Sequence, residues 1–390
     1  MAGPRTLAGA NLLLINNISI DNILPIRHLA YFLIARNPGV HTDPSPSGIK
    51  REAITFSATG SEYFRIWIVN LLLSIVTLGI YSAWAKVRRN RYFYSSTHLA
   101  GSSFEYHGNA VAILKGRIAA LVIFGGYNLA LKTNLVAALV MLAVMMAVMP
   151  WLVWKSLQFK LYNSSYRGIR FGFTGSARKA YFIFLALPLL NLLTAGLMTP
   201  FLHQRLKQFQ HTESRFGASH FSFNAPVGRF YGIYLKFMGM YLGGALALAL
   251  AGGGLFFVFG RQRMEAEEAV KWLPMVLMTL VYLWMFCLLP YFISRMQNLV
   301  WNHTQLQGHA FESDMQWGRS ASLFITNMLG IVLTLGLFVP FAHVRWLKYR
   351  LESMTMVVDG NLDSFVAATQ EQVSAAGEGM VDLLDFDLSM

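Results

Sequence analysis

Three segments of the chain combine a Thr-x-Gly triplet with an arginine at fixed spacing, and these residues are the best candidates for binding a ligand. The arginine follows the threonine by eleven residues in each copy: Thr77 and Gly79 with Arg88, Thr194 and Gly196 with Arg205, Thr334 and Gly336 with Arg345. A guanidinium group binds phosphate through two parallel hydrogen bonds. The arginines could therefore line an anion path or contact lipid phosphate. The favoured interpretation is that they anchor the chain at a membrane boundary.

The triplets and two asparagines point to a second kind of chemistry. Threonine and glycine mark places where a helix unwinds and offers backbone carbonyls to an ion or substrate, but small residues also let helices pack closely. Asn70 and Asn327 each precede a triplet threonine by seven residues. An asparagine in an apolar helix needs a partner, so an interhelical hydrogen bond is the first expectation and a substrate contact the second.

Known catalytic and metal-binding patterns are missing from the sequence. It has no P-loop, no G-x-S-x-G elbow and no Rossmann fingerprint following a strand. The chain has 10 histidines without the spacing of a zinc site, and its single cysteine, Cys287, lies in an apolar run. We therefore expect a protein that is not an enzyme and that carries no metal or cofactor.

Composition indicates a membrane protein. Apolar residues make up 55% of the 390 residues and charged residues only 13%, against about 25% charged residues in soluble domains. The formal charge of +13 does not indicate nucleic acid as a partner, because the Lys and Arg residues flank long apolar runs, where they determine topology. The expected partners are membrane lipids, other membrane proteins and an unknown small-molecule substrate.

Seven stretches approach the roughly 20 apolar residues that a spanning helix needs. The second and third stretches are separated only by residues 132–134 and should form an antiparallel hairpin, and the fifth and sixth should form another. The stretches cover residues 64–84, 111–131, 135–154, 180–202, 230–258, 272–294 and 320–343.

The fourth stretch conflicts with the rule that basic loops stay in the cytoplasm. Basic residues flank it on both sides, but a helix that crosses once cannot keep both ends in one compartment. Either the rule fails there, or residues 180–202 enter the membrane and return, as Pro188, Gly196 and Pro200 would permit. With both alternatives open, the sequence predicts about 4 to 7 transmembrane or re-entrant helices.

Two internal repeats organise the predicted fold. Stretches one, four and seven carry the Thr-x-Gly triplets, and a motif of alternating aromatics with glycine recurs at the same spacing in residues 97–108 and 164–175. Alternation entered by a turn glycine predicts short strands. We predict an all-α polytopic membrane protein with internal repeats and short cytoplasmic β elements. Residues 1–50 form a poorly defined amino-terminal segment and linker, 51–351 the membrane domain and 352–390 an acidic cytoplasmic tail.

One local pattern is specific enough to suggest a family. It consists of Glu62-Tyr63-Phe64, Asn70 and the string TLGIYSAWAKVR at residues 77–88, accompanied by the acidic tail at residues 382–387. From about residue 53 onward, the chain resembles the YjgN-like family of bacterial inner-membrane proteins. The resemblance implies a multi-pass protein of the bacterial inner (plasma) membrane. Because that family is a domain of unknown function, it implies no activity and no catalytic residues.

Two functions fit these features. Repeats that contain interrupted helices are typical of secondary transporters, so the first hypothesis is a transporter or channel-like protein for an unknown small solute. The alternative is a non-catalytic membrane scaffold or assembly factor that binds lipids or other membrane proteins through its basic loops and its acidic tail.

Overall fold

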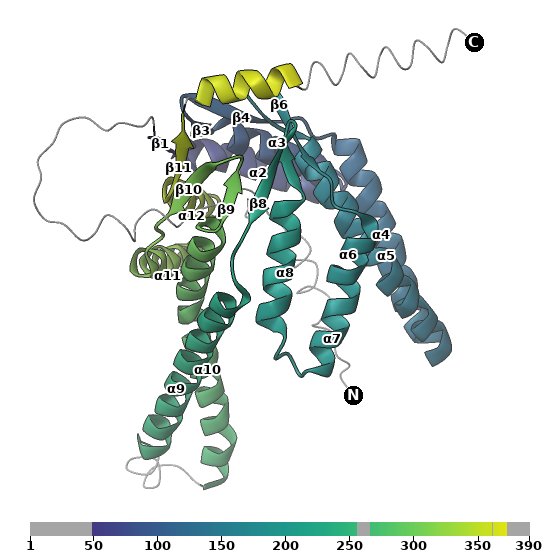
Figure 1. Ribbon diagram of the computed structural model, residues 1–390. Coiled ribbons are helices and arrows are strands. Elements are labelled where there is room, and N and C mark those ends of the chain that lie inside the picture. The colour runs from purple at the N-terminus through teal and green to yellow at the C-terminus, as the bar shows by residue number, and fades with distance from the viewer. Residues whose placement is uncertain (1–48, 256–265, 361, 373–390) are drawn as a thin grey trace, which may run out of the picture.

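The computed structural model describes residues 49–255, 266–360 and 362–372 (Figure 1). Helical hairpins alternate with strands, so that each hairpin begins and ends at the sheet. The strands are β1 (Ile49–Ala53), β2 (Thr55–Phe56), β3 (Thr97–Leu99), β4 (Ser102–Tyr106), β5 (Ser164–Tyr166), β6 (Ile169–Phe173), β7 (Ser214–Phe216), β8 (Ser219–Phe223), β9 (Thr304–Leu306), β10 (His309–Ser313) and β11 (Met354–Asp359). The helices are α2 (Gly60–Val76), α3 (Ser82–Ser95), α4 (Ala110–Thr133), α5 (Leu135–Tyr162), α6 (Ala177–Tyr181), the π-helix η1 (Phe182–Ala186), α7 (Leu187–Leu193), α8 (Thr199–Thr212), α9 (Val227–Leu255), α10 (Ala266–Trp301), α11 (Trp317–Leu333) and α12 (Val339–Glu352).

Within these ranges the strands form one 11-stranded antiparallel sheet. The order of its strands follows the chain from β2 to β11, and β1 lies beside β11. At its two ends β1 pairs with β11 and β2 pairs with β3. Only Ile54 separates β1 from β2, and its amide donates to the carbonyl of Met354 at 3.1 Å. The chain itself thus closes the sheet into a near-barrel. The predicted helical membrane protein with short β elements is confirmed in part, but the all-α class understates the β content, because isolated strand motifs do not reveal that distant segments pair into one sheet.

The tight turns between paired strands explain the glycines of the strand motif. Both turn residues have positive φ at Ala100–Gly101, Arg167–Gly168 and Gln307–Gly308. Two successive residues of positive φ are typical of the two-residue hairpin turn whose twist matches the flanking strands. Glycine adopts this conformation without a steric penalty. The predicted strands and their turn glycines are therefore confirmed at these places.

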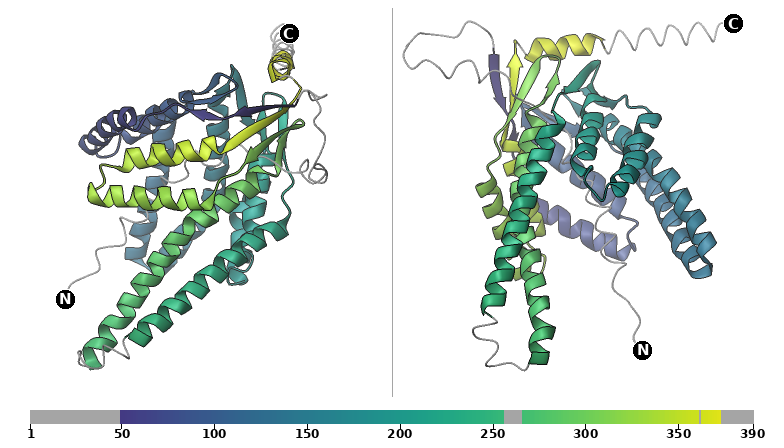
Figure 2. Two further views of the ribbon diagram at one scale, coloured as in Figure 1. Left: turned by 90° about the vertical axis from the view of Figure 1, so that its left-hand side faces the viewer. Right: turned by 60° about the horizontal axis from the view of Figure 1, so that its bottom comes forward.

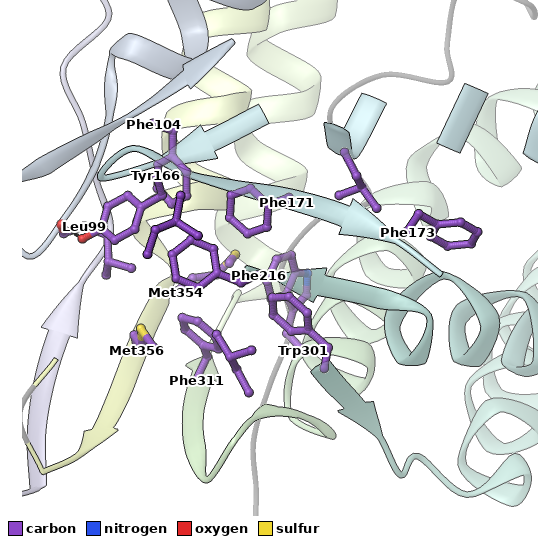
Figure 3. Close-up of a cluster of buried hydrophobic side chains, with 14 of the residues drawn as sticks. Leu99, Phe104, Tyr166, Phe171, Phe173, Phe216, Trp301, Phe311, Met354 and Met356 are labelled. Carbon is purple, nitrogen blue, oxygen red and sulfur yellow. Dashed lines mark hydrogen bonds between the residues drawn. The ribbon is translucent and has the colours of Figure 1, made fainter. Parts of the chain in front are cut away.

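Aromatic and aliphatic side chains fill the inside of the sheet (Figure 3). Phe104, Tyr166 and Phe216 are at most 6% exposed, and their neighbouring ring centroids lie 4.8 and 6.2 Å apart, a range in which aromatic pairs attract. Leu362 and Val366 belong to the same cluster, and the helical segment that contains them lies across one end of the sheet (Figure 1). Side chains therefore occupy the interior of the near-barrel.

In the described part of the chain, four helices are long and apolar enough to cross a membrane. They form two hairpins, α4 with α5 and α9 with α10, which leave the sheet and diverge (Figures 1 and 2). The spans are Ala110–Thr133, Leu135–Tyr162, Val227–Gly254 and Trp272–Trp301. At most 11% of the most apolar window of each span is buried inside the protein. The two predicted hairpins are confirmed, and most of their surface is open to lipid or to other proteins.

The stretches that carry the Thr-x-Gly triplets turn back instead of crossing. They form short hairpins, α2 with α3, α6 to α7 with α8, and α11 with α12 (Figure 1). α2 and α11 have 17 residues each, a length of about 25 Å against a hydrocarbon core of about 30 Å. Because both ends of each hairpin lie at the sheet, the fourth stretch keeps both basic flanks on one side. The structure thus favours the returning alternative over a helix that crosses once.

One buried position recurs in every hairpin of the described ranges, long or short. A proline or alanine stands fourteen residues before the first residue of the following strand, at Ala83, Pro150, Pro200, Pro290 and Pro340. In the short hairpins this residue lies in the first turn of the returning helix, where a missing N–H group costs little. In α5 and α10 it lies inside the helix. The long hairpins therefore correspond to short hairpins whose helices continue beyond this shared position. All five hairpins are related units, arranged as a ring around the sheet.

Candidate functional site

The Thr-x-Gly triplets form the turns at the tips of the short hairpins. Leu78 and Gly79 have φ of 49° and 91°, and the amide of Gly79 donates to the carbonyl of Ser74 at 2.7 Å. Gly196 and Gly336 also have positive φ and make the same hydrogen bond at 2.8 Å. A left-handed residue whose amide bonds five residues back is a common helix C-terminal cap. The triplets therefore reverse the direction of the chain.

The threonine of each triplet bonds to both helices of its hairpin. The hydroxyl of Thr77 donates to the carbonyl of Leu73 at 2.7 Å and accepts from the amide of Tyr81 at 2.9 Å. Thr334 makes the same pair of hydrogen bonds, and Thr194 makes a similar pair. The turn itself thus uses these hydroxyl groups. An additional role of the triplets in binding an ion or substrate stays a prediction.

The hairpin tips are apolar and are distributed around the ring. Leu78 is 95% exposed and Leu335 is 96% exposed. The first and third short hairpins are neighbours, since Phe64 of α2 and Phe341 of α12 have ring centroids 5.6 Å apart. The second short hairpin packs beside α9 instead, through His203. The three triplets therefore do not form one common site.

The repeated arginines each stay with their own hairpin. Arg345 donates to the side-chain oxygen of Asn327 at 2.7 Å, and Arg205 donates to that of Gln208 at 2.7 Å. Arg88 is exposed. This arrangement brings no two of the three arginines together, and their predicted contacts with lipid phosphate concern separate places on the ring.

The two asparagines occupy equivalent buried positions, each 7% exposed. The side-chain amide of Asn327 donates to the carbonyl of Ala342 at 3.2 Å. This bond joins α11 to α12 and is the interhelical bond expected from the sequence. The side-chain oxygen of Asn70 is buried and has no hydrogen-bond partner among the described residues.

A cluster of cations lies where α3 meets α4, and sequence reasoning missed it. Ser82, Lys86 and Arg89 are spaced so that they share one face of α3. Arg117 of α4 donates to the hydroxyl of Ser82. We call these four residues the α3–α4 corner. They belong to two different helices, so only the packing of α3 against α4 brings them together.

Positive charge in the α3–α4 corner is not neutralised by the rest of the described chain. No carboxylate in the described ranges forms an ion pair with Lys86, Arg89 or Arg117. Burial lowers the pKa of Lys86 below its ordinary 10.5, and the charges of Arg117 and Arg89 lower it further. The Nε atom of Arg89 is buried without a hydrogen-bond partner. Buried charge is unfavourable unless an opposite charge accompanies it.

The equivalent corner in the second half of the chain is neutral. Adding 117 to a residue number carries the starts of α2, β3 and α4 onto the starts of α6, β7 and α9. The same shift carries Lys86 onto His203 and Arg117 onto Tyr234. The Nδ1 atom of His203 lies 3.0 Å from the Tyr234 hydroxyl, and burial lowers the pKa of His203 to about 3. This constant offset is the sequence signal that reveals the α3–α4 corner.

Spanning hairpins, returning hairpins and a closed sheet on one side together define a polytopic membrane protein of repeated units. The chain belongs to the family described as bacterial protein of unknown function (DUF898), whose model matches residues 51–383. The resemblance inferred from the string at residues 77–88 is therefore confirmed.

The curated relatives carry the same name. The chain is similar to the inner membrane protein YjgN of Salmonella typhimurium strain LT2, with 33% identity over 141 residues that cover 35% of each chain. The YjgN proteins of Escherichia coli O157:H7 and K12 match with 29% and 25% identity over 38% of this chain and 37% of their own. These matches span little more than a third of the relatives' length. No solved structure matches. The protein is a bacterial inner-membrane protein, as the sequence predicted.

Proposed function

We propose that this protein is a non-catalytic membrane scaffold that holds a transmembrane helix of another membrane protein against α9. The observation that carries the proposal is an open glycine face. A Cβ atom added at Gly239 or Gly243 would meet no atom within 4 Å, whereas one at Gly244 would meet Trp284 of α10. Helix α9 therefore uses one glycine face inside its own hairpin and leaves the other uncovered.

A glycine face of this kind suits a helix as its partner. Gly239 and Gly243 are four residues apart, the spacing at which two helix backbones approach closely inside a bilayer. Lipid tails gain nothing from such a groove, because helix association in membranes depends on close packing between backbones. Leu242 and Leu246 on the same side of α9 are 56% and 60% exposed and add apolar surface for the partner.

Basic residues support an orientation with the sheet in the cytoplasm. In each hairpin a Lys or Arg stands nine residues before the following strand, at Arg88, Lys155, Arg205, Arg295 and Arg345. Cytoplasmic ends of membrane segments carry such an excess of basic residues. In this orientation the exposed acids Asp363 and Glu371 of the described carboxyl-terminal segment also face the cytoplasm, where a partner's soluble part can reach them.

The transport hypothesis has less support. A solute path needs polar surface enclosed by protein, but the sheet interior is filled by the aromatic cluster of Figure 3. The spanning helices form two diverging hairpins instead of one bundle (Figure 2). Solute flux into proteoliposomes of the purified protein, above that of empty vesicles, would overturn the scaffold proposal and favour a transporter.

Cysteine cross-linking in bacterial membranes tests the scaffold directly. In a Cys287→Ala background we place Gly239→Cys in α9 and, as the control, Val122→Cys in α4, which is 68% exposed on the other long hairpin. We expect Gly239→Cys to form a discrete product with a different membrane protein and Val122→Cys to form none. Products that contain only two copies of this chain, or identical products from both variants, would contradict the proposal.

A double substitution with bulky side chains tests the same interface through the affinity for the partner. Gly239→Leu with Gly243→Leu fills the open face, and recovery of the partner identified by cross-linking should fall by about tenfold or more, because close backbone contact is lost. Leu121→Ala, at an exposed position of α4, is the control and should leave recovery unchanged.

A further inference from the structure

The α3–α4 corner gathers hydrogen-bond donors and positive charge without an anionic acceptor among the described residues. Arg117 and Ser82 contact each other across the two helices, and Lys86 and Arg89 continue the same face of α3. Two guanidinium groups and an ammonium group are a donor set that matches the oxygens of phosphate. We propose that this corner binds a phosphate group, supplied by the headgroup of an anionic lipid or by free phosphate.

The depth of the corner suits a lipid phosphate. Helix α4 has 24 residues, a length of about 36 Å, which exceeds the hydrocarbon core of about 30 Å. Arg117 is the eighth residue of α4 and lies about 10 Å from the sheet end of the helix. Its guanidinium group is therefore near the boundary between headgroups and acyl chains, where lipid phosphates lie and where arginine side chains extend toward water.

The groups that surround the corner leave its charge uncompensated. The rings of Tyr63 and Tyr106 lie close enough to Arg89 to feel its charge, but burial raises the pKa of Tyr63 to about 12, so this phenol is uncharged at physiological pH. The acid on α2, Glu62, accepts a hydrogen bond from Tyr92 at 3.0 Å and forms no ion pair with the described arginines.

The equivalent corner in the second half of the chain contains no cation at the positions of Lys86 and Arg117. There the positions of Lys86 and Arg117 hold the hydrogen-bonded pair His203 and Tyr234. The ring of Phe230 lies 5.5 Å from His203 and is fully buried, whereas the smaller Ile113 occupies the corresponding place in α4. The fold is therefore compatible with a neutral corner, so the cations of the α3–α4 corner are not needed for the fold. This site stands apart from the glycine face of α9 and does not depend on the scaffold role.

The test compares two double variants that remove the same charge from the full-length protein. Arg89→Gln with Arg117→Gln empties the α3–α4 corner, and Arg65→Gln with Arg91→Gln removes two exposed arginines of the neighbouring α2 and α3. Retention of phosphatidylglycerol and phosphatidylcholine is measured by native mass spectrometry of the purified protein. We expect the corner variant to weaken phosphatidylglycerol binding by about tenfold or more and the control by less than about twofold.

A second arm distinguishes the two sources of phosphate. Calorimetric titration with inorganic phosphate that depends on Arg89 and Arg117 would assign the site to free phosphate, and binding of phosphatidylglycerol alone would assign it to lipid. Either result supports the proposal. Equal losses in both double variants, or no loss in the corner variant, would overturn it.

A milder substitution covers the case in which the corner variant does not fold. Lys86→Gln removes one cation that lies partly buried on α3 and should weaken phosphatidylglycerol binding about threefold or more. Its thermal midpoint in phosphatidylcholine alone should be at least as high as that of the parent protein. Unchanged phosphatidylglycerol binding by this folded variant would also overturn the proposal.

Discussion

The α3–α4 corner and the corner between α8 and α9 occupy equivalent places in the two halves of the chain and have opposite chemistry. The first holds Lys86 and Arg117 without an acid, and the second holds His203 bonded to Tyr234 at 3.0 Å. From the start of α2 to the start of α4, the offset between equivalent positions of the two halves stays at 117 residues, so the two corners differ in their side chains and not in the length of the chain.

This difference teaches which residues the architecture requires. Both corners share the buried proline or alanine, the Thr-x-Gly turn and a neighbouring strand pair, so these features specify the hairpin and the ring. The cations of the α3–α4 corner are not among them. A neutral pair fills the same place in the other half, and burying cations without a partner opposes folding. Their presence is therefore best explained by a ligand.

Packing is the strongest test of this comparison. Phe230 is fully buried and closes the α8–α9 corner, so Phe230→Ala should lower the free energy of unfolding by about 3 kcal/mol. Its counterpart Ile113 is only half-buried, so Ile113→Ala should cost about 1 kcal/mol. Chemical denaturation of the purified protein in detergent measures both. Equal losses would mean that the two corners are packed alike, which would contradict the difference inferred from the burial of Phe230 and Ile113.

Acidification should affect the two corners differently. His203 has a pKa of about 3 because it is buried, below its ordinary value of 6.5, so the unfolded chain binds a proton that the folded chain does not. Stability is therefore lost as the pH falls below 6.5, by about 2 kcal/mol between pH 7 and pH 5 for this group. The pKa of Lys86 is lowered from its ordinary value of 10.5. Its effect on stability therefore falls in the alkaline range, where stability rises as the pH approaches 10.5.

Thermal midpoints at pH 7 and pH 5 measure this contrast. His203→Gln should remove its share of the loss, and the remaining dependence includes His211, whose pKa burial also lowers to about 3. Lys86→Gln should leave the difference between the two pH values as it is in the parent protein. A His203→Gln variant as sensitive to acid as the parent would show that His203 is not held neutral.

Much of the fold could be predicted because it depends on long, local patterns. The predicted stretches 111–131 and 272–294 lie within α4 and α10, since an apolar run of that length has few alternatives. The closed sheet could not be predicted, because β1 pairs with β11 across some three hundred residues. A returning course was one of two open alternatives for residues 180–202, but the turns at Leu78 and Leu335 were not expected, since both residues have positive φ, which non-glycine residues rarely adopt.

The candidate site was predictable only in part. The Thr-x-Gly triplets were found because they repeat, yet repetition marked a turn that every short hairpin needs. The α3–α4 corner does not repeat: Lys86 and Arg117 are replaced by His203 and Tyr234 in the second half. A search for repeated residues therefore finds the residues that build each hairpin. It misses the positions at which the two halves differ.

The smallest difference between the halves should occur at the turns. Gly79 and Gly196 have φ of 91° and 85°, and an added Cβ atom would meet nothing within 4 Å at Gly79 and only the Thr199 hydroxyl at 3.8 Å at Gly196. The cost of Gly79→Ala and of Gly196→Ala therefore comes from the backbone alone, about 1 kcal/mol in each case. Gly116→Ala, in open space on α4, is the control and should not destabilise the protein.

Thermal unfolding of these three variants checks whether the triplets are only turns. Equal losses at Gly79 and Gly196 mean that both triplets do the same structural work, and that the functional difference between the halves lies in the corners. A much larger loss at Gly79, or a loss of phosphatidylglycerol binding without a loss of stability, would mean that the first tip contacts a ligand. The triplet would then join the α3–α4 corner as part of one site, because Ser82 follows Gly79 by three residues and donates to its carbonyl.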